Sequence, residues 1–560
     1  MNSTSNVAAM PVSRPLRLAV FLDRWDQPAW VSYILESLAA RPDLCEIALV
    51  VKGDLPPSSR TRGQFLYRVY SRVDHLVFGR GAHALRRSDV RQGLGDVDTI
   101  EVVPRRTRYS DYFEAEDVQR VRDQRIDVGL RFGFRIMRGE ILEACRFGIW
   151  SYHHGDDQRF RGGPPGFWEV FENHSTTGSV LQRLSEELDG GVVLQRSYAA
   201  TNRTSVIRSQ DNYYRKSAAF VVRALEELMN GGARTLDAPD PSRSPRVYSH
   251  ALYRPPSNRQ MLRIVPRHVV RRLGDRLLRM WARERWMIGI CKMSSSGDIA
   301  LYRLKTLTPP QDVFWADPFP LRFDGRLFIF VEEYPLDGDR GHIAVLEVDE
   351  QDARVVEHRV VLREGHHLSY PFVFEHDGEH HLVPEASESG RVVAYRAIDF
   401  PWSWEPDRVV IDTGLVDPTL IDHNGSWWLF GTLPYRGASA NDELHAFHGP
   451  SPFGPWEAHP ENPVRSDVQG ARPAGGLFRR GERLYRPGQD CSERYGGGII
   501  LHEVDLDTDH YAEQPAAHMY PEWSTKVRGM HTFNTSGDLA VVDLAVAESW
   551  WSRVRRRVKS

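Results

Sequence analysis

The sequence has few cysteines and no long apolar run. Its 560 residues include four cysteines that lie far apart, with no Cys-x-x-Cys pair: Cys45, Cys145, Cys291 and Cys491. This spacing argues against a disulfide scaffold and a thiolate zinc site, and we expect no metal site. Met1–Pro15 lacks the apolar core of a signal peptide, and no stretch of about 18 apolar residues occurs. We therefore expect a cytoplasmic protein without a membrane-spanning helix.

An excess of charge of one sign is also missing. The 72 Lys and Arg residues nearly balance the 75 Asp and Glu residues, which leaves a formal net charge of −3. This balance argues against a nucleic-acid partner. Hydrophobic residues at 41% and charged residues at 26% are typical of a soluble globular protein and exclude wholesale disorder. The length predicts two or three domains of roughly 100–200 residues each, and the oligomeric state stays open.

After a disordered N-terminus (residues 1–15), residues 16–234 alternate between strand-like and helix-like patterns. Apolar runs at 16–22 and 45–51 flank a helical stretch at 29–40, which is the pattern of a parallel βαβ unit. Residues 127–132 and 146–152 resemble later strands of the same sheet, and residues 218–229 resemble a closing helix. The pattern predicts an α/β Rossmann-like domain.

Residues 235–288 are expected to form a linker that ends in a basic amphipathic helix. Four arginines recur at every fourth position beside an apolar stripe: Arg259, Arg263, Arg267 and Arg271, with Val269, Leu273, Leu277 and Trp281. One interpretation is a connector helix with a solvated face. The other is an interfacial helix with weak contact to an anionic membrane surface, an idea that the basic tail at 548–560 supports.

Residues 289–547 contain an internal repeat. Short apolar strands flank turns that end in glycine, at Gly325, Gly378, Gly425, Gly481 and Gly537, with intervals of 53, 47, 56 and 56 residues. Asp-Gly and Asn-Gly favour tight hairpins because both residues tolerate a positive φ. Hairpins repeated about every 50 residues are typical of a β-propeller, and five repeats predict five blades.

The densest polar chemistry in the first domain lies between Gly148 and Gln195. Ser151, His153 and His154 follow an apolar strand, and Asp189 lies on a glycine-rich turn. Acyl transfer to an amine needs a base, an oxyanion donor and a carboxylate that orients the imidazole, and His153 and Asp189 with a nearby hydroxyl or amide could supply them. The alternative is that these are ordinary polar loop residues.

This stretch resembles the formyltransferase family that uses 10-formyltetrahydrofolate and includes sugar N-formyltransferases. The matching motifs are Ser151-Tyr-His153, Arg161-Gly162 with Pro164, Thr177-Gly-Ser-Val180, and Leu188-Asp-Gly-Gly191. The resemblance implies that His153 is the base, that Asp189 orients it, and that 10-formyltetrahydrofolate is the cofactor. It also implies that Phe132, Gly133 and Phe134 line the folate pocket, although core packing explains the two phenylalanines equally well.

Two further expectations concern the loop. Arg161 and Gly162 are expected to hold a substrate phosphate or the folate tail. Ser151 stands where the family has its catalytic Asn, and a Ser hydroxyl reaches less far as a donor. Three interpretations stay open: Ser151 replaces the Asn, His154 takes that role, or the domain has lost or changed its acyl transfer.

The predicted propeller places acidic residues near its central funnel. Matching repeat positions carry Asp317, Tyr370, Asp417, Arg472 and, more weakly, Met530 or His531, and strand ends carry Glu332, Glu333, Glu385 and Asp490. Two or three carboxylates in one funnel suit glycoside chemistry. The alternative is that Asp-Pro at the strand starts and Asp-Gly in the turns only have a structural role in the propeller blades.

The segment Phe314-Trp-Ala-Asp-Pro318 resembles a motif of five-bladed glycoside hydrolases, which implies that Asp317 is a base. Phe314–Asp543 looks more like the propeller of glucosaminyl inositolphosphorylceramide transferases, on the residues around Arg472 and Arg486. We expect both arginines near the funnel, where they would favour an anionic or acidic-sugar ligand.

These observations together predict an N-formyltransferase that modifies an amine of an amino sugar or related metabolite, with a glycan-recognising propeller. The alternative is a glycoside-active propeller enzyme, hydrolase or transferase-like, with an accessory, degenerate formyltransferase-like domain. A third possibility is a binding protein in which both sites are degenerate.

Overall fold

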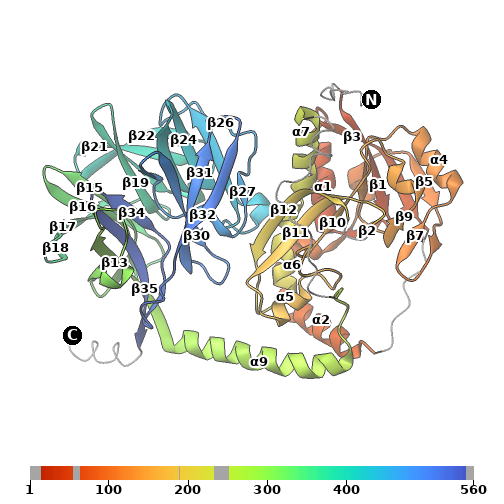
Figure 1. Cartoon of the computed structure of the whole chain (residues 1–560), viewed down its shortest axis with the longest axis horizontal. Helices are drawn as coiled ribbons and strands as arrows, with labels where there is room; N and C mark the ends of the chain where they lie inside the picture. The colour runs from red at the N-terminus through yellow and green to blue at the C-terminus, as the bar shows by residue number, and fades with distance from the viewer. Residues whose placement is uncertain (1–13, 55–62, 188–189, 232–250, 550–560) are drawn as a thin grey trace, which may run out of the picture. The chain divides into compact units, whose positions relative to one another are not determined.

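The computed structural model describes residues 14–54, 63–187, 190–231 and 251–549. The chain divides into two compact units (Figure 1). The first takes in the described residues up to Val269 together with Tyr435–Ala438, and the second takes in the rest. An α/β unit followed by a β-rich unit was the expected order, and this is confirmed. The predicted domain boundaries themselves stay predictions.

The first unit is built on a seven-stranded sheet in the order β12-β11-β10-β8-β1-β3-β5. The five strands from β10 to β5 are parallel, and β11 pairs antiparallel with both β10 and β12. The strands are β1 (Leu16–Leu22), β3 (Cys45–Gly53), β5 (Thr99–Val102), β8 (Val128–Arg131), β10 (Ile149–His153), β11 (Thr176–Arg183) and β12 (Val192–Ala200). The predicted βαβ start is confirmed, since β1 pairs in parallel with β3 across α1 (Ala29–Ala39).

Helices cover both faces of this sheet, which explains why its central strands are apolar throughout. In β1, Leu18 and Val20 face one core with α1 and α7 (Phe220–Gly231). Ala19 and Phe21 face a second core with α4 (Ala115–Asp123). The remaining helices are α2 (Phe65–Phe78), α3 (Arg91–Leu94), α5 (Phe167–Phe171) and α6 (Val206–Ser217); short strands are β2 (Asp26–Pro28), β4 (Arg87–Asp89), β6 (Arg105–Arg106), β7 (Ser110–Tyr112) and β9 (Ile136–Arg138).

The described part of the second unit holds five antiparallel sheets. Four follow one another along the chain. The first sheet consists of β15 (Val313–Phe323), β16 (Arg326–Pro335), β17 (His342–Asp349) and β18 (Arg354–Leu362), and the second of β19 (Ser369–His376), β20 (Glu379–Glu385), β21 (Val392–Asp399) and β22 (Ser403–Ile411). The third consists of β23 (Val416–His423), β24 (Ser426–Thr432), β25 (Glu443–Gly449), β26 (Glu457–Ala458) and β27 (Arg465–Ser466). The fourth consists of β28 (Gln469–Pro473), β29 (Phe478–Arg480), β30 (Arg483–Asp490), β31 (Gly498–Leu506) and β32 (Tyr511–Met519).

The fifth sheet joins the two ends of this unit. Strand β13 (Ala282–Lys292) pairs along its length with β35 (Leu539–Ser549), and β14 (Lys305–Leu307), β33 (Val527–Gly529) and β34 (Phe533–Ser536) complete the sheet. Strand β15 contacts β19, β19 contacts β23, β23 contacts β28, and β34 contacts β15. The Phe533 N–H donates to the Ala474 carbonyl at 2.7 Å, so the segment after β28 also contacts β34.

The predicted hairpin turns are present. All five repeat glycines have a positive φ, between 58° and 80°. In three of the hairpins the preceding residue (Asp324, Asp377 or Asn424) also has a positive φ. Two successive residues of positive φ are the signature of a type I′ turn, which the Asp-Gly and Asn-Gly pairs favour.

The first strands of three sheets share a strained position. Asp317, Tyr370 and Asp417 have φ values of 50°, 45° and 52°, and each precedes a proline. Each also lies where the pairing to the next strand shifts register. Left-handed backbone is costly for residues other than glycine and concentrates at functional sites. The bulges therefore place three equivalent side chains out of the regular ladder.

The predicted basic helix is present as α9 (Asn258–Trp281), with Pro266 inside it. Across the part of the chain that the structure describes, no helix is long and apolar enough to span a membrane.

Candidate functional site

The β-rich unit has a cavity of about 360 Å³ that collects side chains from several of its sheets. Three carboxylates and one guanidinium line it, from Asp317, Glu332, Glu385 and Arg472. The other lining residues are Trp286, Phe314, Ala316, Tyr334, His367, Ser369, Ser387, Val416, Ala440, Tyr495 and His531. Half of the predicted funnel residues are thus brought together, with aromatic rings around them.

Asp317 is held from two neighbouring strands. Its Oδ1 accepts from the Thr532 hydroxyl at 2.6 Å, and its Oδ2 accepts from the Tyr370 N–H at 3.2 Å. The side chain is buried, and burial raises the pKa of Asp317, while His531 and the Thr532 hydroxyl oppose that rise. The left-handed backbone at Asp317 and these two donors fix one orientation of the carboxylate.

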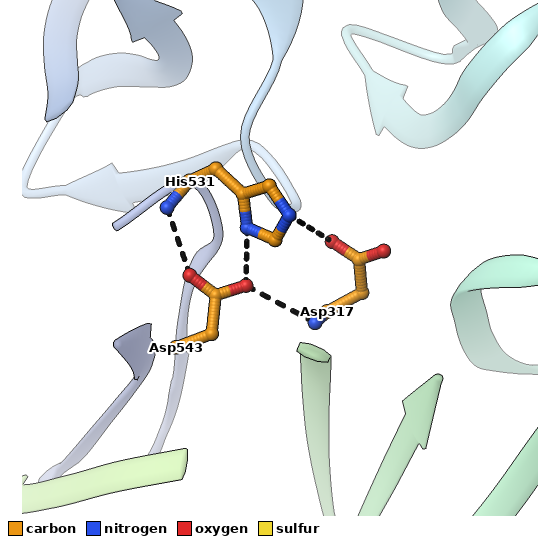
Figure 2. A group of neighbouring side chains, drawn as sticks. All are labelled: Asp317, His531 and Asp543. Atoms are coloured by element: carbon orange, nitrogen blue, oxygen red, sulfur yellow. Dashed lines mark hydrogen bonds and ion pairs between the residues drawn. The ribbon is translucent and has the colours of Figure 1, made fainter. Parts of the chain in front are cut away.

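His531 lies between two carboxylates (Figure 2). Its Nδ1 pairs with Asp543 Oδ2, and its Nε2 lies 3.9 Å from Asp317 Oδ1. Burial lowers the pKa of His531, but Asp543 and Asp317 outweigh it and leave the pKa above its ordinary value. The Asp543 Oδ1 accepts from the His531 N–H at 2.8 Å, and its Oδ2 accepts from the Asp317 N–H at 3.1 Å. Trp286 stacks on the imidazole with ring centroids 4.2 Å apart.

The same three residues bring possible ligand atoms within 4.8 Å of one another, a grouping that could hold a metal ion. We expected no metal site, and this grouping was not foreseen.

Glu332 and Glu385 lie at equivalent ends of the second strands β16 and β20, where they pair across the ladder with Ala316 and Ser369. Glu385 accepts from the Ser369 hydroxyl at 3.0 Å and from the Ser387 N–H at 2.9 Å. Glu332 faces His367 Nε2 at 3.5 Å. Burial and the nearby carboxylates of Asp317 and Glu385 raise the pKa of Glu332 well above its ordinary value. Glu332 is therefore the carboxyl of the cavity that is best suited to carry a proton at neutral pH.

Asp417 lies next to the cavity and is already paired. Arg472 Nε donates to its Oδ2 at 2.6 Å and Arg472 Nη2 donates to its Oδ1 at 3.2 Å. The Gln489 amide donates to Oδ2 at 3.2 Å. Burial raises the pKa of Asp417 to about 6, although Arg472 acts in the opposite direction. The Arg472 guanidinium also lies 5.0 Å from the centroid of the Tyr495 ring.

Besides Asp417, four predicted funnel residues do not line the cavity: Glu333, Tyr370, Asp490 and Arg486. Glu333 accepts from the Trp315 indole N–H at 2.9 Å. Tyr370 is fully buried, and its hydroxyl bonds with Thr419 and accepts from the Gly475 N–H at 2.8 Å, so it ties strands together. Asp490 accepts from the Tyr520 hydroxyl at 2.6 Å and from the Ser492 N–H.

Arg486 is the clearest correction among the funnel residues. It is buried within its own sheet, where Nε donates to Glu513 at 2.9 Å and Nη2 donates to the Gly470 carbonyl at 2.6 Å. Its position on β30 points the side chain toward β32, so it contributes no cation to the cavity.

Several residues that line the cavity or hold its lining residues were not predicted from the sequence. Trp286 was assigned to the linker, and Asp543 and Thr532 carried no motif. Only the weak fifth repeat, which includes His531, hinted at them. They come from β35 and the segments that pair with it, so their approach depends on the sheet that joins the two ends of the unit.

The α/β unit has a second cavity, of about 560 Å³, at the carboxyl ends of its parallel strands. Ser151 and His153 line it from β10, Arg131 lines it from β8, and Gly162 lines it from the following loop. Three of the predicted site residues of this unit, Ser151, His153 and Gly162, therefore line one cavity. Burial lowers the pKa of Arg131 to about 10. Asp189 lies outside the described residues, so its predicted partnership with His153 stays a prediction.

Other predicted residues of this unit lie elsewhere. His154 points into the core, where its Nε2 bonds with the Ser217 hydroxyl at 3.1 Å, and burial lowers its pKa to about 3. It therefore does not replace an oxyanion donor in the cavity. Phe132 packs against Trp30, and Phe134 packs against Phe113.

Gly133 and Arg161 are also absent from the residues that line this cavity. A Cβ on Gly133 would lie 2.5 Å from the Asp23 nitrogen, so this glycine serves a close approach of two backbones. Residues 131–134 thus contribute packing, apart from the Arg131 side chain.

A segment that the sequence assigned to the linker crosses this cavity. Leu252, Tyr253 and Arg254 line it. The Tyr253 N–H donates to the Arg161 carbonyl at 2.8 Å, and the Tyr253 carbonyl accepts from the Gly163 N–H at 3.2 Å. Gly162 has a φ of 97°, and a Cβ there would lie 2.3 Å from the Tyr253 oxygen. We call residues 251–254 the strap.

Comparison with known proteins separates the two halves of the chain. A family model described as "Glucosamine inositolphosphorylceramide transferase 1, N-terminal" matches residues 304–552. Glucosamine inositolphosphorylceramide transferase 1 of Oryza sativa subsp. japonica is 39% identical over 206 residues, which is 36% of this chain and 28% of that protein. The Arabidopsis thaliana protein of the same name is 36% identical over 204 residues, which is 36% of this chain and 27% of that protein. The chain thus spans less than a third of these relatives. The predicted resemblance of this region is confirmed.

The likeness to formyltransferases is weaker. Methionyl-tRNA formyltransferase of Bartonella bacilliformis is 29% identical over 119 residues, which is 21% of this chain and 38% of that protein. Among solved structures, a family 117 glycoside hydrolase of Zobellia galactanivorans aligns with a TM-score of 0.32 at 14% identity, over 48% of this chain and 91% of that chain. Glycinamide ribonucleotide transformylase 1 of Symbiobacterium toebii aligns with a TM-score of 0.29 at 14% identity, over 39% of this chain and 90% of that chain.

These findings correct the predicted activity. The prediction of an N-formyltransferase is wrong, because the relatives at 36–39% identity are named glucosamine inositolphosphorylceramide transferase 1 and the family model of that name matches residues 304–552, in the β-rich half. They favour the alternative interpretation, in which the β-rich unit acts on a glycoside.

Proposed function

We propose that the β-rich unit is a five-bladed propeller whose central cavity binds a glycoside and acts at its glycosidic bond, by transfer or hydrolysis. Each of the five sheets is one blade, and the sheet of β13 and β35 closes the ring. The observation that carries the proposal is the cavity itself. It gathers Asp317, Glu332 and Glu385 from two neighbouring sheets into one concave, largely buried space.

Differences among the three carboxyl groups suit acid–base chemistry. Glycosyl chemistry needs one carboxyl that is protonated and a second that is ionised. Burial and its acidic neighbours favour the protonated form of Glu332. The Thr532 hydroxyl and the His531 imidazole favour the ionised form of Asp317. We assign Glu332 as the proton donor and Asp317 as the base or as the group that stabilises positive charge on the sugar.

The remaining lining fits a polar ring compound. Trp286, Tyr334 and Tyr495 offer apolar ring faces with polar edges, a combination that suits the two kinds of surface on a sugar. Arg472 supplies a cation at the wall. Because Asp417 already pairs with it, the cation favours acidic substituents on the ligand only modestly.

The names of the relatives support transfer over hydrolysis, since those at 36–39% identity are named transferases. In this proposal the α/β unit is accessory. Its cavity keeps Ser151 and His153 but lacks His154, and the strap lies along the loop that follows.

The test is a screen of the full-length protein against aryl glycosides of neutral, amino and acidic sugars, with and without free inositol as an acceptor. Release of the aryl group with free sugar reports hydrolysis, and release with a glycosylated acceptor reports transfer. We expect Glu332→Gln to lower the rate by at least about 100-fold, because a positioned general acid contributes about 10²–10⁴-fold.

Glu379→Gln is the matched control. Glu379 begins β20 and lies exposed on the surface of the same unit, so its neutral variant should keep the wild-type rate. Turnover that survives Glu332→Gln and Asp317→Asn would refute the assignment of the cavity.

A further inference from the structure

Exposed apolar side chains concentrate on two helices. Helix α2 exposes Phe65, Val69, Val73, Leu76 and Val77, each between 43% and 70% exposed. Helix α9 exposes Leu262, Val269, Val270, Leu273 and Leu277, each between 44% and 69% exposed. In both helices the spacing of three, four or seven residues places these side chains along one stripe. A surface helix usually turns its apolar stripe toward the core of the protein. A stripe that faces outward instead marks a surface that binds a partner or a membrane.

The opposite faces of both helices are already used for folding. Met261, Ile264 and Val265 of α9 pack in one cluster with Phe167 and Phe171 of α5. Leu66, Tyr67 and Tyr70 of α2 join the same cluster. The exposed stripes are therefore second apolar faces on helices whose core faces are filled.

The two helices begin side by side. The Asn258 side-chain carbonyl accepts from the Leu66 N–H at 2.9 Å, and the Asn258 N–H donates to the Gly63 carbonyl at 3.0 Å. Figure 1 shows α2 next to the start of α9. The stripe of α2 and the first part of α9 thus belong to one unit and are held in register by Asn258.

Positive charge is concentrated on these helices in a chain whose net charge is −3. Exposed arginines flank the stripes at Arg68, Arg72, Arg259, Arg263, Arg267 and Arg276. The acidic residues within the two helices are few. Asp74 is buried and accepts from the Ile207 N–H at 2.9 Å, and Asp275 is the other.

We propose that α2 and the first part of α9, up to Val269, form a surface that docks on a bilayer containing anionic phospholipid. Aliphatic side chains flanked by arginines are typical of helices that lie in the membrane interface, where the apolar stripe enters the acyl boundary and the cations contact phosphate groups. Protein-binding surfaces instead concentrate Trp and Tyr anchors, and among the stripe residues the one aromatic side chain is Phe65. The docking is independent of glycosyl chemistry.

The test is co-sedimentation of the full-length protein with extruded vesicles. We expect binding to vesicles of phosphatidylcholine mixed with phosphatidylglycerol, weaker binding at high salt, and little binding to phosphatidylcholine alone. The double variants Val73→Ser/Leu76→Ser and Leu262→Ser/Val269→Ser should each lower the partition coefficient by at least about tenfold, because each removes two exposed aliphatic side chains from the interface. Arg259→Gln/Arg263→Gln should lower it and reduce its dependence on salt.

The control is Val356→Ser/Ile398→Ser, which removes two exposed aliphatic side chains from the β-rich unit and should bind as wild type. Failure of the wild type to bind anionic vesicles at low salt would overturn the proposal. Equal binding by the serine variants would do the same. Sedimentation velocity without lipid provides the other decisive arm, since a wild-type dimer that the serine variants dissociate, with no vesicle binding, would assign the surface to a second copy instead.

Discussion

The buried pair of Asp417 and Arg472 gives a quantitative prediction about the centre of the β-rich unit. In Arg472→Met the Asp417 carboxyl keeps only the Gln489 amide at 3.2 Å as a side-chain donor. Its pKa is already about 6 with Arg472 in place. Without the guanidinium it should rise above 7, so the folded variant takes up a proton.

The magnitude follows from the protonation of one aspartate. Holding a group with an ordinary pKa near 3.9 in its protonated form costs about 1.4 kcal/mol for each pH unit above that value. Because the wild-type pKa is already about 6, most of this cost is present in the wild type as well. The variant should therefore lose about 1.4 kcal/mol relative to the wild type at pH 7 and almost nothing at pH 5 through this protonation. The sign follows because the folded pKa lies above the unfolded one, so stability is lost as the pH rises. The wild-type pair itself contributes little net stability, since desolvation offsets its attraction.

The assay is urea-dependent hydrogen exchange by mass spectrometry, which gives the opening free energy of the β-rich unit from its own peptides. Asp417→Asn added to Arg472→Met should restore most of the loss at pH 7 and remove its pH dependence, because Asn tolerates the left-handed backbone at this position. Arg396→Met is the surface control. Arg396 bridges Glu379 and Glu405 at the surface, so its loss should cost less than about 1 kcal/mol. A loss for Arg472→Met that is the same at pH 5 and pH 7 would refute the reasoning.

Two other predictions concern the α/β unit. Burial raises the pKa of Glu169 to about 8 from its ordinary 4.5, so the folded protein favours the protonated carboxyl and stability is lost as the pH rises between these values. Glu169→Gln should therefore stabilise this unit by up to about 4 kcal/mol at pH 8 and by little at pH 5. Equal stabilisation at both pH values in denaturant melts would contradict this prediction. Gly162→Ala should release the strap, because the new methyl group would clash with the Tyr253 carbonyl, and the rate of hydrogen exchange at residues 251–254 should rise at least tenfold. Gly425→Ala is the control, because the space around a Cβ there is open. It should cost only about 1–2 kcal/mol from its positive φ and leave the strap protected from exchange.

Local pattern was enough to predict much of the fold. The strand at 16–22 and the helix at 29–40 were located to within a residue, since buried parallel strands and amphipathic helices leave strong periodicities. The repeat glycines marked their hairpins correctly because few residues tolerate a positive φ. Basic periodicity likewise predicted α9.

The candidate site was predictable only in part. Asp317, Glu332, Glu385 and Arg472 recur at equivalent places in a repeat, so their convergence followed from the repeat itself. Arg486 also occupies a repeat position, but the buried Glu513 on the neighbouring strand captures it. Sequence spacing does not show which neighbouring residue a long side chain will pair with in the folded protein.

Other failures have a different origin. Trp286 reaches the cavity, and Asp543 reaches His531 beside it, through pairing between the two ends of the unit, which are separated by about 250 residues of sequence. The prediction of formyl transfer failed because its motifs are short loop segments within about 45 residues, whereas the likeness of the β-rich half extends over residues 304–552. The expected cytoplasmic location stays a prediction.

The most direct test of the central claim is a crystal structure of Glu332→Gln soaked with the glycoside that the activity screen identifies. The variant should retain binding while turnover is blocked. The account predicts a sugar ring in the 360 Å³ cavity, against Trp286 and within hydrogen-bond distance of residue 332 and Asp317. A glycoside bound in the α/β cavity, or none bound in the β-rich unit, would contradict it.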